Sequence, residues 1–372
     1  MKFICTQENL NQGLLVASHI NTKNINLPIL NNVLLKIEDN ILKLISTNLE
    51  VALITKIRGK AEKDGEYTVP AKLLSDYVAL LPKENVNISL EDNFLHVSCA
   101  NRKTKIKGIK SDDFPLIPQI DKKHTFYIDG HELKRALAQV AFAVLPNESR
   151  PEISGIYINF NGELGKIILV ATDSFRLTEK KAKINEKSSK EQISVIVPLR
   201  SVWELINILS TITGENNLLE ISLDEGQIFF SYNGTELTSR LVEGIFPDYQ
   251  QIIPKEHNTR ATLSVGELLS GTRSASLFSR SGLNDIKLNI NSQGMIEVYS
   301  TDNQTGEQKT KITGVVEGAS NKIVLNHKYL VDGLSNLGSG ELIMDIIDEN
   351  SPCILRPAGD DTYLYVVMPI KQ

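Results

Sequence analysis

Two hydrophobic periods alternate along the chain and predict strands that lead into amphipathic helices. Residues 126–129 alternate apolar and polar side chains, as a half-buried strand does. From residue 130 on, apolar side chains recur three or four positions apart, which is the spacing of one helix face. They are Leu133, Leu137, Val140 and Val144. We therefore expect a strand followed by a helix, and the other side of this helix carries Lys134, Arg135 and Gln139.

A hairpin and a second helix follow each such segment. Asp39-Asn40 and Asn161-Gly162 separate alternating runs and predict tight turns. Val-Pro at 69–70 and 197–198 ends a short strand, and we expect the proline to open the helix, where its missing N–H costs nothing. Asn326 takes that place in the third copy as an N-cap. The positions expected to be buried are Leu73, Leu74, Tyr77, Val78 and Leu81, and later Val202, Leu205, Ile206 and Leu209.

This order of elements occurs three times, so the chain contains an internal repeat. The strands before the second helices place Val69, Val197 and Leu325 at intervals of 128 residues. The threonines after the hairpins, Thr47, Thr172 and Thr301, keep intervals of 125 and 129 residues. Leu10, Leu133 and Leu268 mark the first helices. Because DDFPLIP and GIFPDYQQIIP end the first two copies alike, we expect three α+β domains, at residues 1–121, 122–254 and 255–372.

Composition limits the class of protein. Of the 372 residues, 41% are hydrophobic and 23% are charged, and no apolar run approaches the length of a membrane span. The N-terminus has no export signal, so we expect a cytoplasmic protein. Cys5, Cys99 and Cys353 form no CxxC pair, which disfavours a disulfide framework or a zinc site. The net charge of −5 disfavours a protein that binds nucleic acid over its whole surface, although it allows a local basic lining.

Eight short phrases in a fixed order give the chain a family resemblance. They are LPIL at 27–30, TVPA at 68–71, DDFP at 112–115, NESRP at 147–151, ATDSFRL at 171–177, VIVP at 195–198, FPDY at 246–249 and VVMP at 366–369. With these phrases the chain resembles the bacterial β sliding clamps, the β subunits of DNA polymerase III, over essentially its whole length.

The resemblance implies a fold and a function. The fold is the DNA clamp fold, with three repeated domains of two helices each on antiparallel sheet, and two protomers join head to tail into a six-domain ring. The function is that of a non-catalytic processivity factor that encircles double-stranded DNA without regard to sequence. Its partners are the polymerase α subunit, the clamp loader and other proteins with a clamp-binding motif, and it needs no cofactor, metal or membrane.

Helix dimensions agree with a dimer. Six helices packed about 9 Å apart in a ring would trace about 54 Å and leave almost no hole. Twelve would trace about 108 Å and leave a hole of about 24 Å, slightly wider than a DNA duplex.

The first candidate site is the DNA-facing lining. Basic residues recur at the start of the second helices and along the first helices: Lys72, Arg200, Lys328, Lys134, Arg135 and Arg273. Each could instead be a solvated position on a helix face. Their recurrence in phase favours a basic lining that attracts phosphates. The resemblance adds the loop residues Asn24, Asn147 and Arg150, although relatives often carry a basic residue at the position of Asn24, beside Lys23.

The second candidate site is a peptide pocket, which the resemblance places between the second and third domains. Its residues are Ile153, Gly155, Thr172, Ser174, Phe175, Arg176, Leu177, Pro247, Pro352, Val366, Val367, Met368, Pro369 and Ile370. Alternatively, VVMPI is an ordinary buried C-terminal strand. Relatives commonly have Gly-His where this chain has Ser174-Phe175, so we expect a more apolar and narrower pocket.

The third candidate site is the joint between protomers. The resemblance sets Thr104, Ile106 and Ile109 of the first domain against Arg273, Ser276, Leu277 and Phe278 of the third. The alternative is that NRKTKIKGIK is a lysine-protected edge strand that pairs with nothing.

Enzyme motifs are missing from the sequence. It contains no GxSxG, GxxxxGK[ST] or HExxH motif. Asp173 could act as an acid, but Asn48 and Asp302 stand at the corresponding positions, and a structural role at a strand end explains all three. Two classes therefore remain open: a DNA-encircling tether with a peptide dock, and a repeated-domain hydrolase with an unidentified active site.

Overall fold

The computed structural model describes residues 1–20, 26–117, 121–145, 149–211, 217–280 and 282–371, and these contain twenty-six strands and six α-helices. The chain divides into two compact units. The first consists of Met1–Lys134, Ile184–Glu191 and Arg200–Val242. The second consists of Arg135–Lys183, Gln192–Leu199 and Glu243–Gln372.

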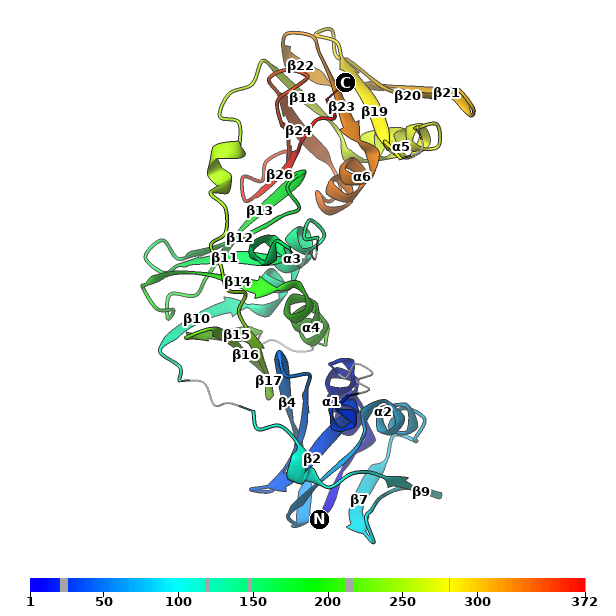
Figure 1. The fold of residues 1–372 in the computed structure, drawn as a ribbon, viewed down its shortest axis with the longest axis vertical. Coiled ribbons are helices and arrows are strands. Elements are labelled where there is room, and N and C mark those ends of the chain that lie inside the picture. Colours follow the sequence, from blue (N-terminus) through cyan, green and yellow to red (C-terminus); the bar gives the residue numbers. More distant parts are fainter. Residues whose placement is uncertain (21–25, 118–120, 146–148, 212–216, 281, 372) are drawn as a thin grey trace. The chain divides into compact units, whose positions relative to one another are not determined.

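The first unit contains two antiparallel sheets (Figure 1). The smaller has the strand order β5 (Lys60–Lys63), β1 (Lys2–Thr6), β7 (Asn85–Glu91), β8 (Phe94–Cys99) and β9 (Arg102–Lys107). The larger has the order β10 (His124–Asp129), β15 (Leu218–Asp224), β16 (Gln227–Tyr232), β17 (Thr235–Arg240), β4 (Val51–Arg58), β3 (Ile41–Thr47), β2 (Asn32–Glu38) and β6 (Gly65–Pro70).

The second unit repeats this plan. Its larger sheet has the order β14 (Gln192–Pro198), β11 (Gly155–Asn161), β12 (Lys166–Thr172), β13 (Arg176–Lys183), β26 (Tyr363–Val367), β25 (Cys353–Pro357), β24 (Glu341–Ile346), β18 (Thr259–Ser264) and β22 (Val315–Gly318). Its smaller sheet has the order β21 (Gly306–Thr313), β20 (Met295–Asp302), β19 (Asp285–Ile290) and β23 (Asn321–Asn326).

Each large sheet joins strands from two sequence repeats. β4 of the first repeat pairs with β17 of the second, and Leu53 lies opposite Leu237. β13 of the second repeat pairs with β26 of the third, and Leu177 lies opposite Val366. The middle repeat therefore contributes strands to both large sheets, which explains why the boundary between the compact units runs through it.

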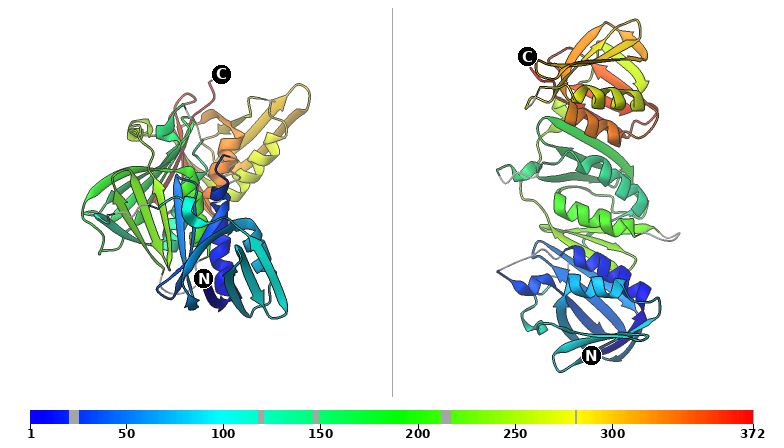
Figure 2. Two further views of the ribbon diagram at one scale, coloured as in Figure 1. Left: turned by 60° about the horizontal axis from the view of Figure 1, so that its bottom comes forward. Right: turned by 90° about the vertical axis from the view of Figure 1, so that its right-hand side faces the viewer.

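The helices occur in pairs that the repeat predicts: α1 (Gln7–His19) and α2 (Ala71–Ala79), α3 (Gly130–Ala141) and α4 (Leu199–Ser210), and α5 (Val265–Ser276) and α6 (His327–Asn336). α1 packs beside α2, and α5 packs beside α6 (Figure 2). Asn326 caps α6 as predicted, since its side chain accepts a hydrogen bond of 2.9 Å from the N–H of Lys328. Pro70 differs from expectation: it ends β6 as the residue before α2, so the helix begins at Ala71.

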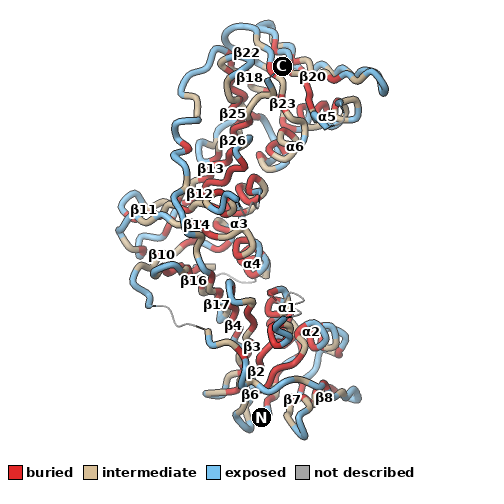
Figure 3. The backbone as a smooth tube through the Cα atoms, in the orientation of Figure 1, coloured by how far each residue is buried: buried red, intermediate tan, exposed pale blue. Residues whose placement is uncertain are grey.

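Buried residues occur along both the strands and the helices of each unit (Figure 3). The predicted first-helix leucines, Leu10, Leu133 and Leu268, are all at most 1% exposed. The second helix of the middle repeat buries its four predicted residues, but in α2 the prediction for Leu73 is wrong, since this side chain is 54% exposed. Leu74 takes the core-facing position, and one residue further along a helix turns a side chain by about 100°. Tyr77 is only half-buried.

The hairpin turn predicted at Asn161-Gly162 spans the four residues Gly162–Gly165.

Candidate functional site

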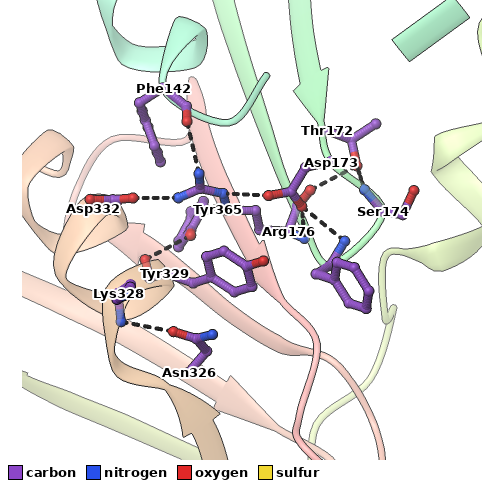
Figure 4. Close-up of polar contacts among 11 residues, drawn as sticks. Phe142, Thr172, Asp173, Ser174, Arg176, Asn326, Lys328, Tyr329, Asp332 and Tyr365 are labelled. Atoms are coloured by element: carbon purple, nitrogen blue, oxygen red, sulfur yellow. Dashed lines mark hydrogen bonds and ion pairs between the residues drawn. The ribbon is translucent and has the colours of Figure 1, made fainter. Parts of the chain in front are cut away.

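The turn between β12 and β13 is held by its own polar side chains (Figure 4). Asp173 Oδ1 accepts hydrogen bonds from the backbone N–H groups of Phe175 (2.9 Å) and Arg176 (3.0 Å). The Thr172 hydroxyl donates to the Arg176 carbonyl at 2.7 Å and accepts from the Ser174 N–H at 3.1 Å. These bonds hold Ser174 at φ 78°, a left-handed conformation that favours glycine.

The same turn recurs at the two corresponding positions. Asn48 Oδ1 accepts from the N–H groups two and three residues later, at 3.0 and 2.7 Å. Asp302 Oδ1 does likewise, at 2.8 and 3.1 Å. Side chains of this length bond their own backbone two residues on and so close turns. The structural role predicted for Asp173, Asn48 and Asp302 is therefore the role that the hydrogen bonds describe.

Arg176 fastens three elements of the second unit together. Its Nε donates to Asp173 Oδ2 at 2.9 Å, its Nη1 to Asp332 Oδ2 of α6 at 2.6 Å, and its Nη2 to the Phe142 carbonyl just beyond α3 at 3.0 Å (Figure 4). The guanidinium lies 4.6 Å from the centre of the Tyr329 ring. Burial lowers the pKa of Arg176, but the hydrogen bond to Asp332 and the interactions with Tyr365 and Asp173 together outweigh burial, and the pKa is raised.

Sequence reasoning missed these partners of Arg176. Asp332 lies 156 residues away in the chain and Phe142 lies 34 away, so no local spacing links them to the turn. All three guanidinium nitrogens are engaged within the fold, so Arg176 orders this surface.

The structure brings together the three distant segments ATDSFRL, FPDY and VVMPI. β13 pairs with β26, and beyond β26 the N–H of Met368 donates to the Phe175 carbonyl at 2.9 Å. Phe246 and Tyr249, on either side of Pro247, pack in one hydrophobic cluster with Leu177 and Val366. Burial raises the pKa of the Tyr249 hydroxyl, as does its 2.6 Å hydrogen bond to Glu179.

The predicted pocket residues divide into a buried floor and an accessible rim. The buried members are Ile153, Gly155, Thr172, Leu177, Val366 and Val367. The accessible or half-buried members are Ser174, Phe175, Arg176, Pro247, Pro352, Met368, Pro369 and Ile370. Phe175 is 60% exposed and stacks on Tyr329 with ring centres 6.5 Å apart. Val366 and Val367 are thus strand residues of the interior, whereas Met368 begins an apolar segment outside the sheet.

The six helices carry as many acidic as basic residues. The basic residues are Lys72, Lys134, Arg135, Arg200, Arg273 and Lys328. The acidic residues are Glu8, Asp76, Glu132, Glu204, Glu267 and Asp332. Considered alone, the helices are balanced in charge, so their basic residues give them no net positive charge.

The predicted DNA contacts differ in their surroundings. Lys72 has a side chain that is 90% exposed, with its ammonium 3.9 Å from Asp76. Arg135, Arg273 and Lys328 are also exposed, and Lys134 is half-buried. Arg200 instead donates to the Ile20 carbonyl at the end of α1, at 3.1 Å. Arg150 donates to Glu152 (3.1 Å) and to the Ser174 hydroxyl (2.8 Å). The predictions for Lys23, Asn24 and Asn147 lie outside the described residues.

The predicted joint residues occupy two edges. Thr104 and Ile106 belong to β9, an outer strand of its sheet, and Ile106 is only 4% exposed because its side chain belongs to the core. Ile109 is 43% exposed. At the end of α5, Leu277 is 75% exposed, Arg273 is exposed, and Ser276 and Phe278 are half-buried.

Among the described residues, no group of three or more His, Cys, Asp or Glu side chains could hold a metal ion. In the same part of the chain, no helix is long and apolar enough to span a membrane.

Family models cover nearly the whole chain. The N-terminal, central and C-terminal domains of the DNA polymerase III beta subunit match residues 1–118, 127–248 and 250–371. The beta sliding clamp of Synechococcus elongatus is 27% identical over 100% of this chain and 99% of its own length. The beta sliding clamp of Staphylococcus aureus is 28% identical over 82% of this chain and 80% of its own length.

Solved structures agree with these matches. The crystal structure of the Pseudomonas aeruginosa DNA polymerase III subunit beta has a TM-score of 0.93 at 27% identity, with 100% of both chains covered. The Thermotoga maritima beta subunit has a TM-score of 0.93 at 26% identity and covers 100% of this chain and 99% of its own. The repeat, the fold and these matches agree, and the chain belongs to the family of bacterial DNA polymerase III beta subunits, the non-catalytic sliding clamps that give DNA polymerase its processivity.

Proposed function

We propose that two copies of this chain close head to tail into a six-domain ring around duplex DNA. The ring holds the polymerase α subunit, the clamp loader and other proteins with clamp-binding motifs through the surface around Phe175. Each copy supplies three domains, with boundaries near residues 121 and 254. The protein works in the cytoplasm.

The proposal of a ring rests on two outer strands that, in the part of the chain that the structure describes, have no partner strand on one side, although their counterparts in the other repeats are paired. The first repeat joins the second through the strand pair β4·β17, and the second joins the third through β13·β26. By the repeat, β21 of the third domain corresponds to β4 and β13, and β9 of the first domain corresponds to β17 and β26. Both β21 and β9 are outer strands of their sheets. A second copy supplies the missing partner at each end, and two such joints close a ring.

DNA is held in this ring mainly by topology. The net charge is −5 and the helices are balanced in charge, so electrostatic attraction over the lining is weak. The exposed Lys72, Arg135, Arg273 and Lys328 contact phosphates, together with Lys134, Arg150, Arg200 and the loop residues Lys23, Asn24 and Asn147. Contacts of this kind carry no sequence information, which suits a protein that slides.

Partner peptides bind where the three distant segments meet. Phe175, Met368 and Pro247 present apolar side chains at the rim, above a floor that includes Leu177 and Val366. Short hydrophobic segments bind such surfaces through a few buried anchors. Because Arg176 is engaged by Asp173, Asp332 and Phe142, it holds the turn that carries Phe175 in place.

The ring is tested by retention on DNA. Clamps loaded on a nicked circle should resist a salt wash and should dissociate when the circle is cut, because linear DNA has ends. Trp203 of α4 is the only tryptophan of the chain and is 44% exposed, so its emission should change on loading and revert on cutting. Equal retention on circular and linear DNA without end blocks would show that the binding is not topological. A monomer at every protein concentration would exclude the ring.

A further inference from the structure

We infer that the joint between the two copies sets lysine against lysine, so that the ring tightens as ionic strength rises. Lys103 of β9 in one copy meets Lys309 and Lys311 of β21 in the other. The inference rests on the proposed homodimer, but it makes a separate claim about which charges meet and with what consequence.

The correspondence between β21 and β4 follows from the hairpins that contain them. In the first repeat Thr47 pairs with Ala52, and in the third the corresponding Thr301 pairs with Glu307. Counting along both strands from these pairs, Lys309 takes the place of Ile54, and Lys311 takes the place of Lys56. The alignment is supported by burial, because Ile57 and its counterpart Ile312 are both 3% exposed.

The correspondence between β9 and β17 follows in the same way. Both strands return from a preceding strand through a two-residue turn, so that Arg102 pairs with Cys99, and Thr235 pairs with Tyr232. One position further along, Lys103 takes the place of Glu236. Ile106 then corresponds to Ser239, and both are buried.

The junction within the chain supplies the register for the joint. Glu236 lies opposite Ile54, and Thr238 lies opposite Ala52. Transferred to the joint, this register sets Lys103 opposite Lys309, and Lys105 opposite Glu307. Lys105 and Glu307 have opposite charges and form a favourable pair. Lys103 and Lys309 have like charges directly across the strands, which destabilises a sheet.

The contrast is sharpest at an ion pair. Within the chain, Lys56 of β4 and Glu236 of β17 form an ion pair of 2.5 Å across the junction. Both counterparts at the joint are lysines, Lys311 and Lys103. The other in-chain junction also pairs opposite charges, since the ammonium of Lys180 in β13 lies 3.4 Å from Asp360, just before β26.

The positive charge at the joint is not cancelled by the rest of the two strands. β9 carries Arg102, Lys103, Lys105 and Lys107 and no acidic residue, and β21 carries Lys309 and Lys311 against Glu307. One more carboxylate is close, because Glu297 of β20 lies 2.6 Å from Lys309. A lysine-rich edge strand also keeps the free monomer from pairing with the edge strands of unrelated chains. The same charges that weaken the joint therefore protect the monomer from aggregation.

Salt should therefore strengthen this dimer. Repulsion between exposed charges is screened over a Debye length of about 10 Å at 0.1 M salt and about 3 Å at 1 M. The dissociation constant of the full-length dimer, measured by sedimentation, should fall several-fold between about 0.05 M and 0.5 M sodium chloride. Lys103→Glu places a negative charge at this position, as Glu236 does at the in-chain junction. Because the ring contains the joint twice, the gain from each joint adds, and the dissociation constant at low salt should fall by about tenfold.

The control is Lys187→Glu, which makes the same change in net charge at an exposed residue of Ile184–Glu191. It should leave the dissociation constant unchanged. A dimer that weakens with salt, or that Lys103→Glu fails to tighten relative to Lys187→Glu, would overturn the lysine-on-lysine joint while leaving the ring in place. No dimer in any salt, for the parent chain and for Lys103→Glu alike, would overturn the ring itself.

Discussion

Arg176 and Asp332 form an ion pair of 2.6 Å between β13 and α6, two elements that belong to different sequence repeats. The same guanidinium donates to the Phe142 carbonyl just beyond α3. In the first unit, Arg200 of α4 donates to the Ile20 carbonyl just beyond α1. An arginine therefore binds the C-terminal end of a first helix at both junctions within the chain, where the helix dipole favours a cation. The two arginines occupy different positions of the repeat, one in β13 and one in α4. The same kind of contact is therefore made by two different residues of the repeat.

Replacing Arg176 by Ala should lower the free energy of unfolding of the second unit by about 3 kcal/mol, because it leaves a buried carboxylate without its partner. The side chain of Asp173 is only 3% exposed. Urea unfolding followed by circular dichroism measures the loss. Asp332→Asn is the matched comparison: Asp332 is 47% exposed, so its loss should cost less than about 1 kcal/mol. Equal effects of the two variants would show that Asp173 does not depend on Arg176.

Local patterns predict the repeated parts of this fold well. The turn at Asn48, Asp173 and Asp302 is closed by hydrogen bonds within five residues, so each copy can be read from its own sequence. The helix faces at Leu133 and Leu205 are likewise local.

Pairings across the chain could not be predicted. β4 and β17 lie about 180 residues apart, and nothing in Leu53 or Leu237 indicates that they face each other. Arg176 was predicted as one of the pocket residues, and its neighbours in sequence, Phe175 and Leu177, are apolar. Its polar partners come from the residue just beyond α3, from α6 and from the preceding turn, and only the folded chain brings the first two close.

Acid should destabilise the second unit through Asp345, which is 4% exposed and bonded by Arg260 (2.7 Å) and Arg356 (2.6 Å). Burial raises the pKa of this carboxyl, but the hydrogen bond from Arg260 and the charge of Arg356 outweigh burial and hold the pKa below its ordinary value of 3.8. The stabilisation is therefore complete above pH 3.8 and is lost as the pH falls through the lower folded-state value.

The urea midpoint of the parent chain should consequently drop more between pH 6 and pH 3 than that of Asp345→Asn, which has no carboxyl to protonate. Other carboxyls titrate in both proteins and cancel in the difference. Parallel pH profiles for the two proteins would contradict this account.

Ser174→Gly should stabilise the turn that carries Phe175. Ser174 has φ 78°, where a Cβ costs about 1–2 kcal/mol, and glycine avoids this cost at a smaller loss of about 0.5–1 kcal/mol through greater freedom in the unfolded chain. Ser174→Ala is the control, because it also loses the hydroxyl that accepts from Arg150 but keeps the Cβ. The glycine variant should exceed the alanine variant by about 0.5–1 kcal/mol in free energy of unfolding. An alanine variant as stable as the glycine variant would mean that the turn stores no strain.

Truncating Met368 should weaken peptide binding without opening the ring. Met368 is half-buried beyond the end of β26, and its N–H donates to the Phe175 carbonyl, so the two residues are neighbours in the fold. Met368→Ala removes one apolar anchor, worth about 1 to 3 kcal/mol in such surfaces. Deleting residues 368–372 removes the whole segment and should weaken binding further. Titration of fluorescent clamp-binding peptides from polymerase measures both.

Phe175→His provides the sharper comparison, because it changes the exposed ring and leaves the backbone bond to Met368 in place. Phe175 stacks on Tyr329, so a smaller polar ring should alter the order in which peptides with different hydrophobic anchors bind, more than it alters the dimer. β26 remains complete in all three variants, since it ends at Val367, and sedimentation should find the parent dimer in each. If Met368→Ala and the deletion bind these peptides as tightly as the parent chain, the peptide surface lies elsewhere and the segment after Val367 only completes the fold.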